Sequence, residues 1–262
     1  MEITVIIAAA GLSRRFGEQD KLAQDLGGRA MLLRTVEIFT KREEVGGIIV
    51  ASPPEDFDAF KDKFAATLGF HGARIVRGGT VDRWESIRNA LAEVPETATH
   101  IAVHDAARPG VSGKLLDRLF AAARTLPAVI PAVDVAGTVK RVSPEVTEVN
   151  EDEDAVADLI LGESSRSTIA TRTVQATVDR VNLVEVQTPQ VFEASLLRRA
   201  YAQEDLAGAT DDASLVERLG EAVSVIEGER ANIKVTAPED LTLMRAILGV
   251  KPPAERPAHK RF

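Results

Sequence analysis

The sequence predicts an α/β protein whose central sheet is mostly parallel and is flanked by helices on both faces. Short, continuously apolar segments alternate with amphipathic segments of helical period along the first half of the chain. This alternation is typical of strand–helix–strand units, because parallel strands need long crossover connections and are buried on both faces. The chain has 262 residues, 45% of them hydrophobic, which is enough for one large core.

Strands and helices are expected in strict alternation up to residue 133. The apolar segments predict strands at 3–9, 46–52, 73–79, 100–106 and 127–133. The amphipathic segments between them predict helices at 30–42, 54–69, 82–94 and 113–125. Ligands of such sheets bind beyond the carboxyl ends of the strands. The segments that follow the strands are therefore the expected place for a binding site.

A different pattern begins near residue 134. Extended segments at 134–150 and 178–192 flank an acidic run and a polar, Ser/Thr-rich loop, which together predict an extended arm. Beyond the arm, the expected elements are helices at 193–204 and 211–220, a strand at 222–228, and a strand from 232 that runs into a final helix beginning at Pro238. The segment 249–262 carries three prolines and is expected to be a disordered tail.

The composition excludes several classes of function. A net charge of -8 argues against nucleic acid as a partner, because proteins that grip a phosphate backbone present a basic face. The absence of cysteine rules out disulfides and thiolate metal sites, and it fits a reducing cytoplasm. The four histidines lack the spacing of a zinc site. No apolar run reaches the ~18 residues of a membrane span, and the chain enters a strand at once, so neither a membrane segment nor a signal peptide is expected.

A glycine turn rich in cations follows the first predicted strand. Residues 8–22 have the sequence AAAGLSRRFGEQDKL, in which Gly11 is followed by Arg15 and Lys21. Backbone N–H groups at such a turn converge on an anion, and the two side chains add fixed positive charge. The pattern is neither G-x-G-x-x-G nor a P-loop. It suits the binding site of a triphosphate that also reacts there. The alternative is a surface turn whose cations are solvated.

The segment HDAARP at 104–109 ends the fourth predicted strand. Asp105 could hold Mg²⁺ or a sugar hydroxyl there, and Arg108 could bind a phosphate through two N–H groups. The alternative is an Asp–Arg ion pair that closes a turn.

The segment GGTVDRWESI at 78–87 follows the third predicted strand. Gly78 and Gly79 have no Cβ and let the backbone approach a flat base, while Ser86 could bond to the base edge or the ribose. The alternative is a turn and a helix start capped by Asp82, and both interpretations can hold together.

Three more polar side chains lie in the last third of the chain. Thr188 in QTPQVF and Thr210 in GATDDAS supply hydroxyls, although each alone is better explained as a helix cap. Lys234 lies in NIKVTAPEDL, among apolar residues of a predicted strand, where it needs an anionic partner or a route to solvent. The alternative is an edge-strand lysine that deters pairing.

Taken together, these motifs resemble those of one family, the 2-C-methyl-D-erythritol 4-phosphate cytidylyltransferases of the non-mevalonate isoprenoid pathway. HDAARP, TPQVF and NIKVTAPEDL are specific to that family and its nearest relatives, whereas AAAGLSRRFG is shared with nucleotidyltransferases generally. The resemblance runs from residue 3 to about 248. It implies a single Rossmann-like domain of the nucleotide-diphospho-sugar transferase type at 1–248, with a protruding β arm and insertion at about 134–187 that builds a homodimer.

The resemblance also implies a reaction and a set of site residues. CTP and the methylerythritol phosphate would give 4-diphosphocytidyl-2-C-methyl-D-erythritol and pyrophosphate, with Mg²⁺ mainly on the CTP phosphates and Asp105 as a candidate metal ligand. The implied catalytic residues are Arg15, Lys21, Arg180 and Lys234. The implied nucleotide-binding residues are Ala9, Ala10, Gly11, Gly78, Gly79, Arg83, Ser86, Asp105 and Ala106. The implied substrate-binding residues are Asp105, Arg108, Thr138, Arg180, Thr188, Thr210 and Lys234, of which Thr138 and Arg180 would reach the active site of the other subunit.

The chain departs from the family pattern at three places. The family usually has Pro-Lys-Gln where this chain has Asp20-Lys21-Leu22, and the Arg-to-Lys spacing is one residue shorter here. The stretch from Gly79 to Arg83 is one residue longer than usual. The arm carries roughly 20 extra residues, judged against the short loops of compact domains. They include the acidic segment 148–158, which is expected to loop into solvent.

Three alternatives remain open at this point. Ribitol-5-phosphate cytidylyltransferases share the chemistry but typically have Ser-Val where this chain has Ala106-Ala107. A molybdenum-cofactor nucleotidyltransferase would explain the Asp20-Lys21 pair but not HDAARP or NIKVT. A non-catalytic nucleotide-binding protein would bind CTP without releasing pyrophosphate.

Overall fold

The computed structural model describes residues 1–11, 16, 20–150 and 168–252. The chain divides into two compact units, residues 1–133 with 186–262, and residues 134–185. The limits of the second unit lie close to those expected for the arm and its insertion. The single domain expected at 1–248 stays a prediction, and most of the expected tail lies outside the described residues.

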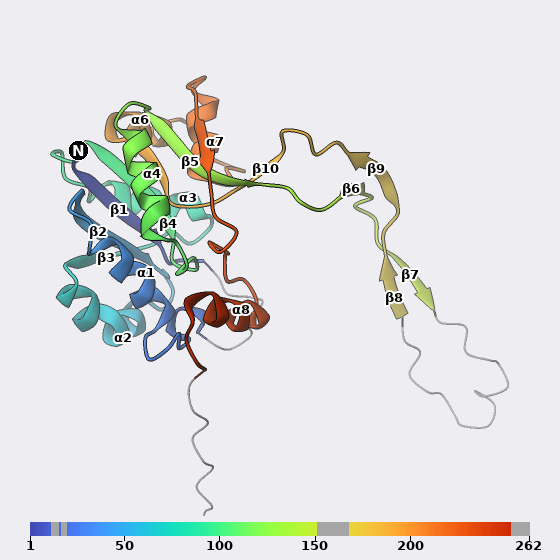
Figure 1. The fold of residues 1–262 in the computed structure, drawn as a ribbon, viewed down its shortest axis with the longest axis horizontal. Helices are drawn as coiled ribbons and strands as arrows, with labels where there is room; N and C mark the ends of the chain where they lie inside the picture. The colour runs from blue at the N-terminus through green and yellow to red at the C-terminus, as the bar shows by residue number, and fades with distance from the viewer. Residues whose placement is uncertain (12–15, 17–19, 151–167, 253–262) are drawn as a thin grey trace, which may run out of the picture. The chain divides into compact units, whose positions relative to one another are not determined.

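An eight-stranded sheet organises the fold (Figure 1). Its strand order is β10-β5-β11-β4-β1-β2-β3, with β12 also paired to β5. The pairs β1–β2, β2–β3, β1–β4 and β5–β12 are parallel, whereas β11 lies antiparallel between β4 and β5. The predicted, mostly parallel sheet is therefore confirmed. The strands are β1 (Ile3–Ala8), β2 (Val45–Ser52), β3 (Ala73–Arg77), β4 (His100–Asp105), β5 (Ala128–Asp134), β10 (Val184–Val186), β11 (Gln190–Glu193) and β12 (Ser224–Glu227).

Every predicted helix is present, with ends that differ by a few residues. Local chemistry sets several of these ends: the Ser112 hydroxyl accepts the Leu115 N–H at the start of α4, and Gly249, with φ of 64°, ends α8. No helix within the described ranges has the length and apolarity needed to cross a membrane. The helices are α1 (Met31–Phe39), α2 (Phe57–Phe70), α3 (Arg83–Leu91), α4 (Gly113–Ala123), α6 (Ala194–Tyr201), α7 (Asp212–Arg218) and α8 (Pro238–Leu248), with a short 3₁₀ helix η2 (Lys21–Ala23).

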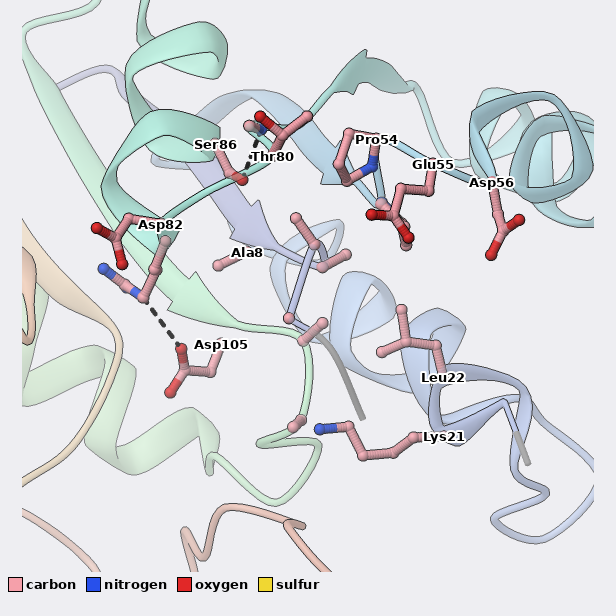
Figure 2. A pocket seen from close by; sticks show the side chains of 18 of the residues that line it. Ala8, Lys21, Leu22, Pro54, Glu55, Asp56, Thr80, Asp82, Ser86 and Asp105 are labelled. Atoms are coloured by element: carbon pink, nitrogen blue, oxygen red, sulfur yellow. Dashed lines mark hydrogen bonds and ion pairs between the residues drawn. The ribbon is translucent and has the colours of Figure 1, made fainter. Parts of the chain in front are cut away.

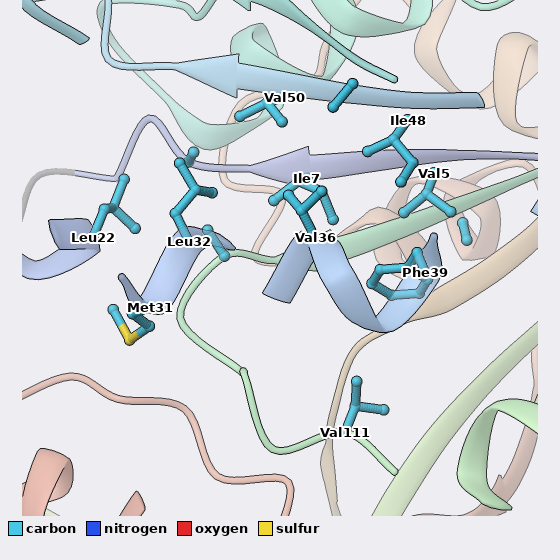
Figure 3. Close-up of a cluster of buried hydrophobic side chains, with 14 of the residues drawn as sticks. Val5, Ile7, Leu22, Met31, Leu32, Val36, Phe39, Ile48, Val50 and Val111 are labelled. Atoms are coloured by element: carbon cyan, nitrogen blue, oxygen red, sulfur yellow. The ribbon is translucent and has the colours of Figure 1, made fainter. Parts of the chain in front are cut away.

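The sheet separates two hydrophobic clusters. Val5 and Ile7 of β1 belong to a first cluster with Phe39 of α1 (Figure 3), together with residues of α2, α4 and α8. Ile6, between them in sequence, belongs to a second cluster with Ile87 of α3 and residues of α6 and α7. Successive strand residues point to opposite faces, so this division explains why most residues on both faces of β1 are apolar.

The strand expected from residue 232 is wrong. Residues 232–236 form no strand in the structure. The Val235 N–H instead donates to the Ala107 carbonyl at 2.8 Å, and the buried Asn232 side chain donates to the Thr188 carbonyl at 2.9 Å. The apolar residues around Lys234 thus anchor a loop against the end of β4.

The second unit consists of two antiparallel strand pairs. β6 (Val139–Val142) pairs with β9 (Val174–Val178), and β7 (Thr147–Asn150) pairs with β8 (Thr168–Thr171). The extended character predicted for this segment is confirmed. Large apolar side chains are at least half exposed on it, namely Val146, Val149, Ile169, Val174 and Val181. Most of the acidic segment 148–158 lies outside the described residues.

Candidate active site

A cavity of about 380 Å³ lies where β1 and β4 end, bounded by loops that follow β2 and β3 (Figure 2). This is the edge of a parallel sheet at which ligands bind. The cavity brings together residues that are distant in sequence, because the segments that follow the strands line it together. The predicted site residues that line it are Ala9, Ala10, Gly11, Lys21, Gly79, Arg83, Ser86, Asp105, Ala106 and Lys234.

Part of the cavity wall was not predicted. Pro53, Pro54, Glu55 and Asp56, which follow β2, line the cavity, and so do residues 80–82. These residues could have been predicted only from their position after β2, because β2 ends at the same edge of the sheet as β1 and β4. The sequence of this segment carries no recognisable binding motif.

Asp105 is the electrostatic centre of the site. Its carboxylate lies 3.0 Å from Lys234 Nζ, 3.4 Å from Arg108 Nε and 3.8 Å from Arg83 Nε. Burial alone would raise the pKa of Asp105, but the three cations hold it well below its usual range. The carboxylate is therefore ionised at neutral pH and accepts hydrogen bonds only. The ion pair with Arg108, which the sequence left as an alternative, is present together with the cavity.

A chain of hydrogen bonds lies behind Asp105. The Asp105 N–H donates to the Thr188 hydroxyl oxygen at 3.0 Å, and that hydroxyl lies 3.1 Å from His104 Nδ1. His104 Nε2 lies 3.1 Å from the Arg108 carbonyl, which only accepts, so Nε2 carries the hydrogen and Nδ1 accepts from Thr188. The Thr188 hydroxyl hydrogen is thus committed within the protein, and any role in binding substrate would use its remaining lone pair.

We expect the fold to lose stability through His104 as the pH falls from 6.5 to 4. The ring is fully buried, and burial lowers its pKa to about 4. The unfolded chain, with a histidine pKa of about 6.5, therefore takes up this proton first. The contribution of His104 to the free energy of unfolding is therefore fully present above pH 6.5, and up to about 3 kcal/mol of it is lost across this window. Urea unfolding at pH 7 and at pH 4.5 measures the loss.

The matched variant for that measurement is His104→Gln. It removes the titrating ring, so its unfolding free energy should depend less steeply on pH than that of the natural chain. Equal pH slopes for the two proteins would show that His104 does not carry the effect.

The cationic turn after β1 is partly described. Asp20 begins η2, where its carboxylate accepts the N–H groups of Leu22 at 2.9 Å and Ala23 at 3.3 Å and pairs with Lys63 of α2 at 2.8 Å. Leu22 is buried in the first cluster (Figure 3). The backbone at Lys21 is therefore held in place by the residues on either side of it. Figure 2 shows the ammonium group of Lys21 pointing to the side on which Asp105 lies. Arg15 lies outside the described residues.

The glycine pair after β3 approaches its neighbours too closely for any side chain. A Cβ on Gly79 would lie 2.1 Å from the Glu85 Cβ, and one on Gly78 would lie 2.4 Å from the Ser52 carbonyl oxygen. The Gly79 N–H donates to the Ser86 hydroxyl at 2.9 Å, as the dashed line in Figure 2 shows.

The start of α3 differs from the expected cap. Asp82 occupies the N-cap position, but its side chain accepts no hydrogen bond from α3. Glu85 instead accepts the Val81 N–H at 2.9 Å. The expected capping hydrogen bond of Asp82 is therefore wrong. The Glu85 side chain instead folds back over the glycine turn and accepts an N–H that precedes the helix.

Comparison with known proteins identifies the family. The family model for 2-C-methyl-D-erythritol 4-phosphate cytidylyltransferase matches residues 3–157 and 146–250. The chain belongs to this family. The cytidylyltransferase of Bacteroides fragilis is 35% identical over 246 residues, covering 94% of this chain and 99% of the relative. That of Frankia casuarinae is 39% identical, covering 97% and 84%.

Solved cytidylyltransferase structures share the fold. The crystal structure of 2-C-methyl-D-erythritol 4-phosphate cytidylyltransferase from Thermus thermophilus is 30% identical, with a TM-score of 0.70 over 95% of this chain and 100% of that chain. The enzyme from Francisella tularensis is 26% identical, with a TM-score of 0.71 over 94% and 100%. The Rossmann-like nucleotidyltransferase fold is therefore confirmed.

Several residues implied by the cytidylyltransferase resemblance do not line the cavity. Gly78 and Thr188 lie next to it and contact lining residues. Thr210 is exposed and directly precedes Asp211, the N-cap of α7. Thr138 and Arg180 belong to the second unit, where the Arg180 guanidinium donates to the Ala136 carbonyl. Their roles stay predictions.

The residues of this cytidylyltransferase-family site do not fit a metal held by the protein. Among the described residues, no group of three or more Asp, Glu or His side chains could hold a metal ion. Asp105, the candidate ligand, already faces Lys234, Arg108 and Arg83, and a further cation at the same carboxylate would be repelled.

Proposed function

We infer that the chain joins CTP to 2-C-methyl-D-erythritol 4-phosphate, giving 4-diphosphocytidyl-2-C-methyl-D-erythritol and pyrophosphate. The observation that carries this inference is the cavity in which the glycine turn, Lys21, Lys234 and the ionised Asp105 converge at the carboxyl end of the sheet. Family membership supplies the identity of the two substrates. The charge pattern suits them, since both reacting groups are phosphates.

The proposed reaction is an in-line displacement at phosphorus. An oxygen of the substrate phosphate forms a bond to the α-phosphorus of CTP, and the bond from that phosphorus to the bridging oxygen of the β-phosphate breaks. Negative charge develops on the α-phosphate and on the departing pyrophosphate. Fixed cations aimed at these oxygens stabilise the transition state more than the ground state. We assign this role to Arg15 and Lys21, and the orientation of the attacking phosphate to Lys234.

We propose that Asp105 binds hydroxyl groups where the ribose and the second substrate meet. A carboxylate that stays ionised accepts hydrogen bonds and donates none, so hydroxyls suit it and phosphates do not. Arg108 and Lys234, which both contact Asp105, supply the positive charge for the phosphate next to those hydroxyls.

We further propose that Mg²⁺ enters with the phosphates of CTP rather than on a protein site. Mg²⁺ commonly binds through substrate phosphates and few carboxylates, and it neutralises charge on the triphosphate. A chain without cysteine suits a reducing compartment, so we assign the reaction to the cytoplasm.

We propose that the second unit builds a homodimer and completes the site. Its exposed apolar side chains, Val149, Ile169, Val174 and Val181 among them, would be covered by a second copy. Thr138 and Arg180 of one subunit would then contact the phosphate bound mainly by the other.

A substrate panel tests the proposed function. The chain is incubated with CTP and either 2-C-methyl-D-erythritol 4-phosphate or ribitol 5-phosphate, and pyrophosphate release is followed. Faster release with the methylerythritol phosphate is expected. Faster release with ribitol 5-phosphate would favour that rival, and CTP binding without release from either would favour a non-catalytic nucleotide-binding protein.

The glycine pair and Ser86 are expected to select cytosine. Because the Ser86 oxygen accepts from Gly79, its own hydrogen can be donated to the pyrimidine edge, and a wrong base leaves such groups unpaired. We expect kcat/KM for CTP to exceed that for UTP by about 100-fold, and Ser86→Ala to narrow the ratio by about 10-fold. Equal values for the two nucleotides in the natural chain would contradict this assignment.

A further inference from the structure

A buried set of polar side chains connects α3, α6 and α7 behind the cavity. The Tyr201 hydroxyl donates to Asp212 Oδ1 at 2.5 Å, and Arg83 Nη2 lies 2.8 Å from Asp212 Oδ2. Asp212 is fully buried and Tyr201 nearly so. Asp212 therefore touches no ligand itself. It contacts Arg83, which is the one arginine among the described residues that line the cavity.

Arg83 lies between two carboxylates at unequal distances. Its Nη2 is 2.8 Å from Asp212, whereas its Nε is 3.8 Å from Oδ1 of Asp105. The other oxygen of Asp105, Oδ2, already faces Lys234 and Arg108. Of the two oxygens of Asp105, Oδ1 therefore has the longer distance to its cation. Asp105 itself lines the cavity.

Both partners of Asp212 keep their protons. Burial and the neighbouring Asp212 raise the pKa of Tyr201 well above its usual range, so its hydroxyl remains a donor. Burial alone would lower the pKa of Arg83, but the carboxylates of Asp212 and Asp105 raise it. The three groups thus form a fixed arrangement of one donor, one carboxylate and one guanidinium.

We propose that Asp212 is a positioning residue that holds the Arg83 guanidinium away from Asp105, so that Asp105 Oδ1 stays open to a hydroxyl of the bound nucleotide. Without the charge of Asp212, the guanidinium would close on Asp105, the nearest remaining carboxylate, and would occupy the oxygen that the ligand needs. Tyr201 supports this by satisfying the other oxygen of Asp212. The proposal rests on the proposed function, since it takes CTP as the ligand of the cavity.

The test is a double-mutant cycle on CTP affinity. Asp212→Asn keeps the size of the side chain and an oxygen for Tyr201 but removes the charge. We expect its Kd for CTP with Mg²⁺, measured by calorimetry, to rise about 10-fold. In an Arg83→Gln background the same change should alter the Kd by less than about 2-fold, because Asp212 acts through Arg83. A purely structural role would move the unfolding midpoint and give the same Kd change in both backgrounds.

Asp211→Asn is the matched control. Asp211 is the adjacent carboxylate and caps α7 by accepting the Ser214 N–H at 3.0 Å, a bond that asparagine can also make. It should leave the CTP affinity within about 2-fold of the natural value. If Asp212→Asn does not fold, a Kd about 10-fold weaker in Arg83→Gln/Asp212→Asn, which removes both charges, than in Arg83→Gln still overturns the proposal.

The outcomes separate this proposal from the function on which it rests. An unchanged Kd in Asp212→Asn, an equal loss with and without Arg83, or a double variant about 10-fold weaker than Arg83→Gln would each overturn the positioning role. A natural chain that neither binds CTP nor releases pyrophosphate would overturn the proposed function instead.

Discussion

Lys21→Met is expected to lower kcat by about 100-fold or more, while the affinity for CTP changes only a few-fold. The proposed role of the ammonium group is to stabilise charge that develops on the α-phosphate and pyrophosphate, so its loss affects the transition state more than the bound nucleotide. The side chain is well placed for this, because Leu22 anchors the same turn in the first cluster. Pyrophosphate release gives kcat, and calorimetry gives the CTP affinity.

Lys61→Met is the control for the Lys21 variant. Lys61 lies on α2, is 43% exposed and pairs with Asp58 at 3.2 Å, so its replacement removes the same charge outside the cavity. Its kcat should match that of the natural chain. If Lys21→Met itself turned over at the natural rate, the shortened spacing after Gly11 would have moved the role to another cation, and Arg14 would be the next residue to replace.

Mixing two nearly inactive variants is expected to restore activity. One chain carries Arg180→Ala and the other carries Lys21→Met. If each site combines Lys21 of one subunit with Arg180 of the other, a mixed dimer has one site with both defects and one intact site. Random exchange makes half of the dimers mixed, so activity should return to about a quarter of the natural value.

Subunit exchange has to be demonstrated in the same sample, for example by mass spectrometry of chains with different labels. Exchange without recovery would mean that Arg180 serves its own chain or no site at all. If one of the two variants alone keeps substantial activity, the side chain replaced in that variant lacks the role assigned to it.

The sheet and its helices could be predicted because burial leaves a periodic signal in the sequence. The segment ITVIIA is apolar at every position except Thr4 because both faces of β1 are covered. The antiparallel placement of β11 between β4 and β5 could not be foreseen, since it depends on where the chain returns from the second unit. The strand wrongly expected from residue 232 also depends on tertiary contacts. Its apolar residues pack against the end of β4 without joining a sheet.

The site was predictable where a residue type follows a strand end, and not where tertiary contacts give a residue its role. Asp105 ends β4, the glycine pair directly follows β3, and Lys21 belongs to the turn after β1, so local sequence pointed to them. Asp212 looked like one of two similar carboxylates at the start of a helix. Its contacts with Arg83 and Tyr201 come from different helices, and no local pattern distinguishes it from Asp211.

The walls of the cavity are connected to both hydrophobic clusters, so a bound ligand contacts elements from each side of the sheet. One wall belongs to η2, whose Leu22 is part of the first cluster, and another belongs to α3, whose Ile87 is part of the second. A nucleotide that touches both walls ties together two halves of the interior that the sheet otherwise keeps apart. Bound CTP should therefore slow amide hydrogen exchange in α1 as well as in α3, because opening either half would first require the ligand to leave.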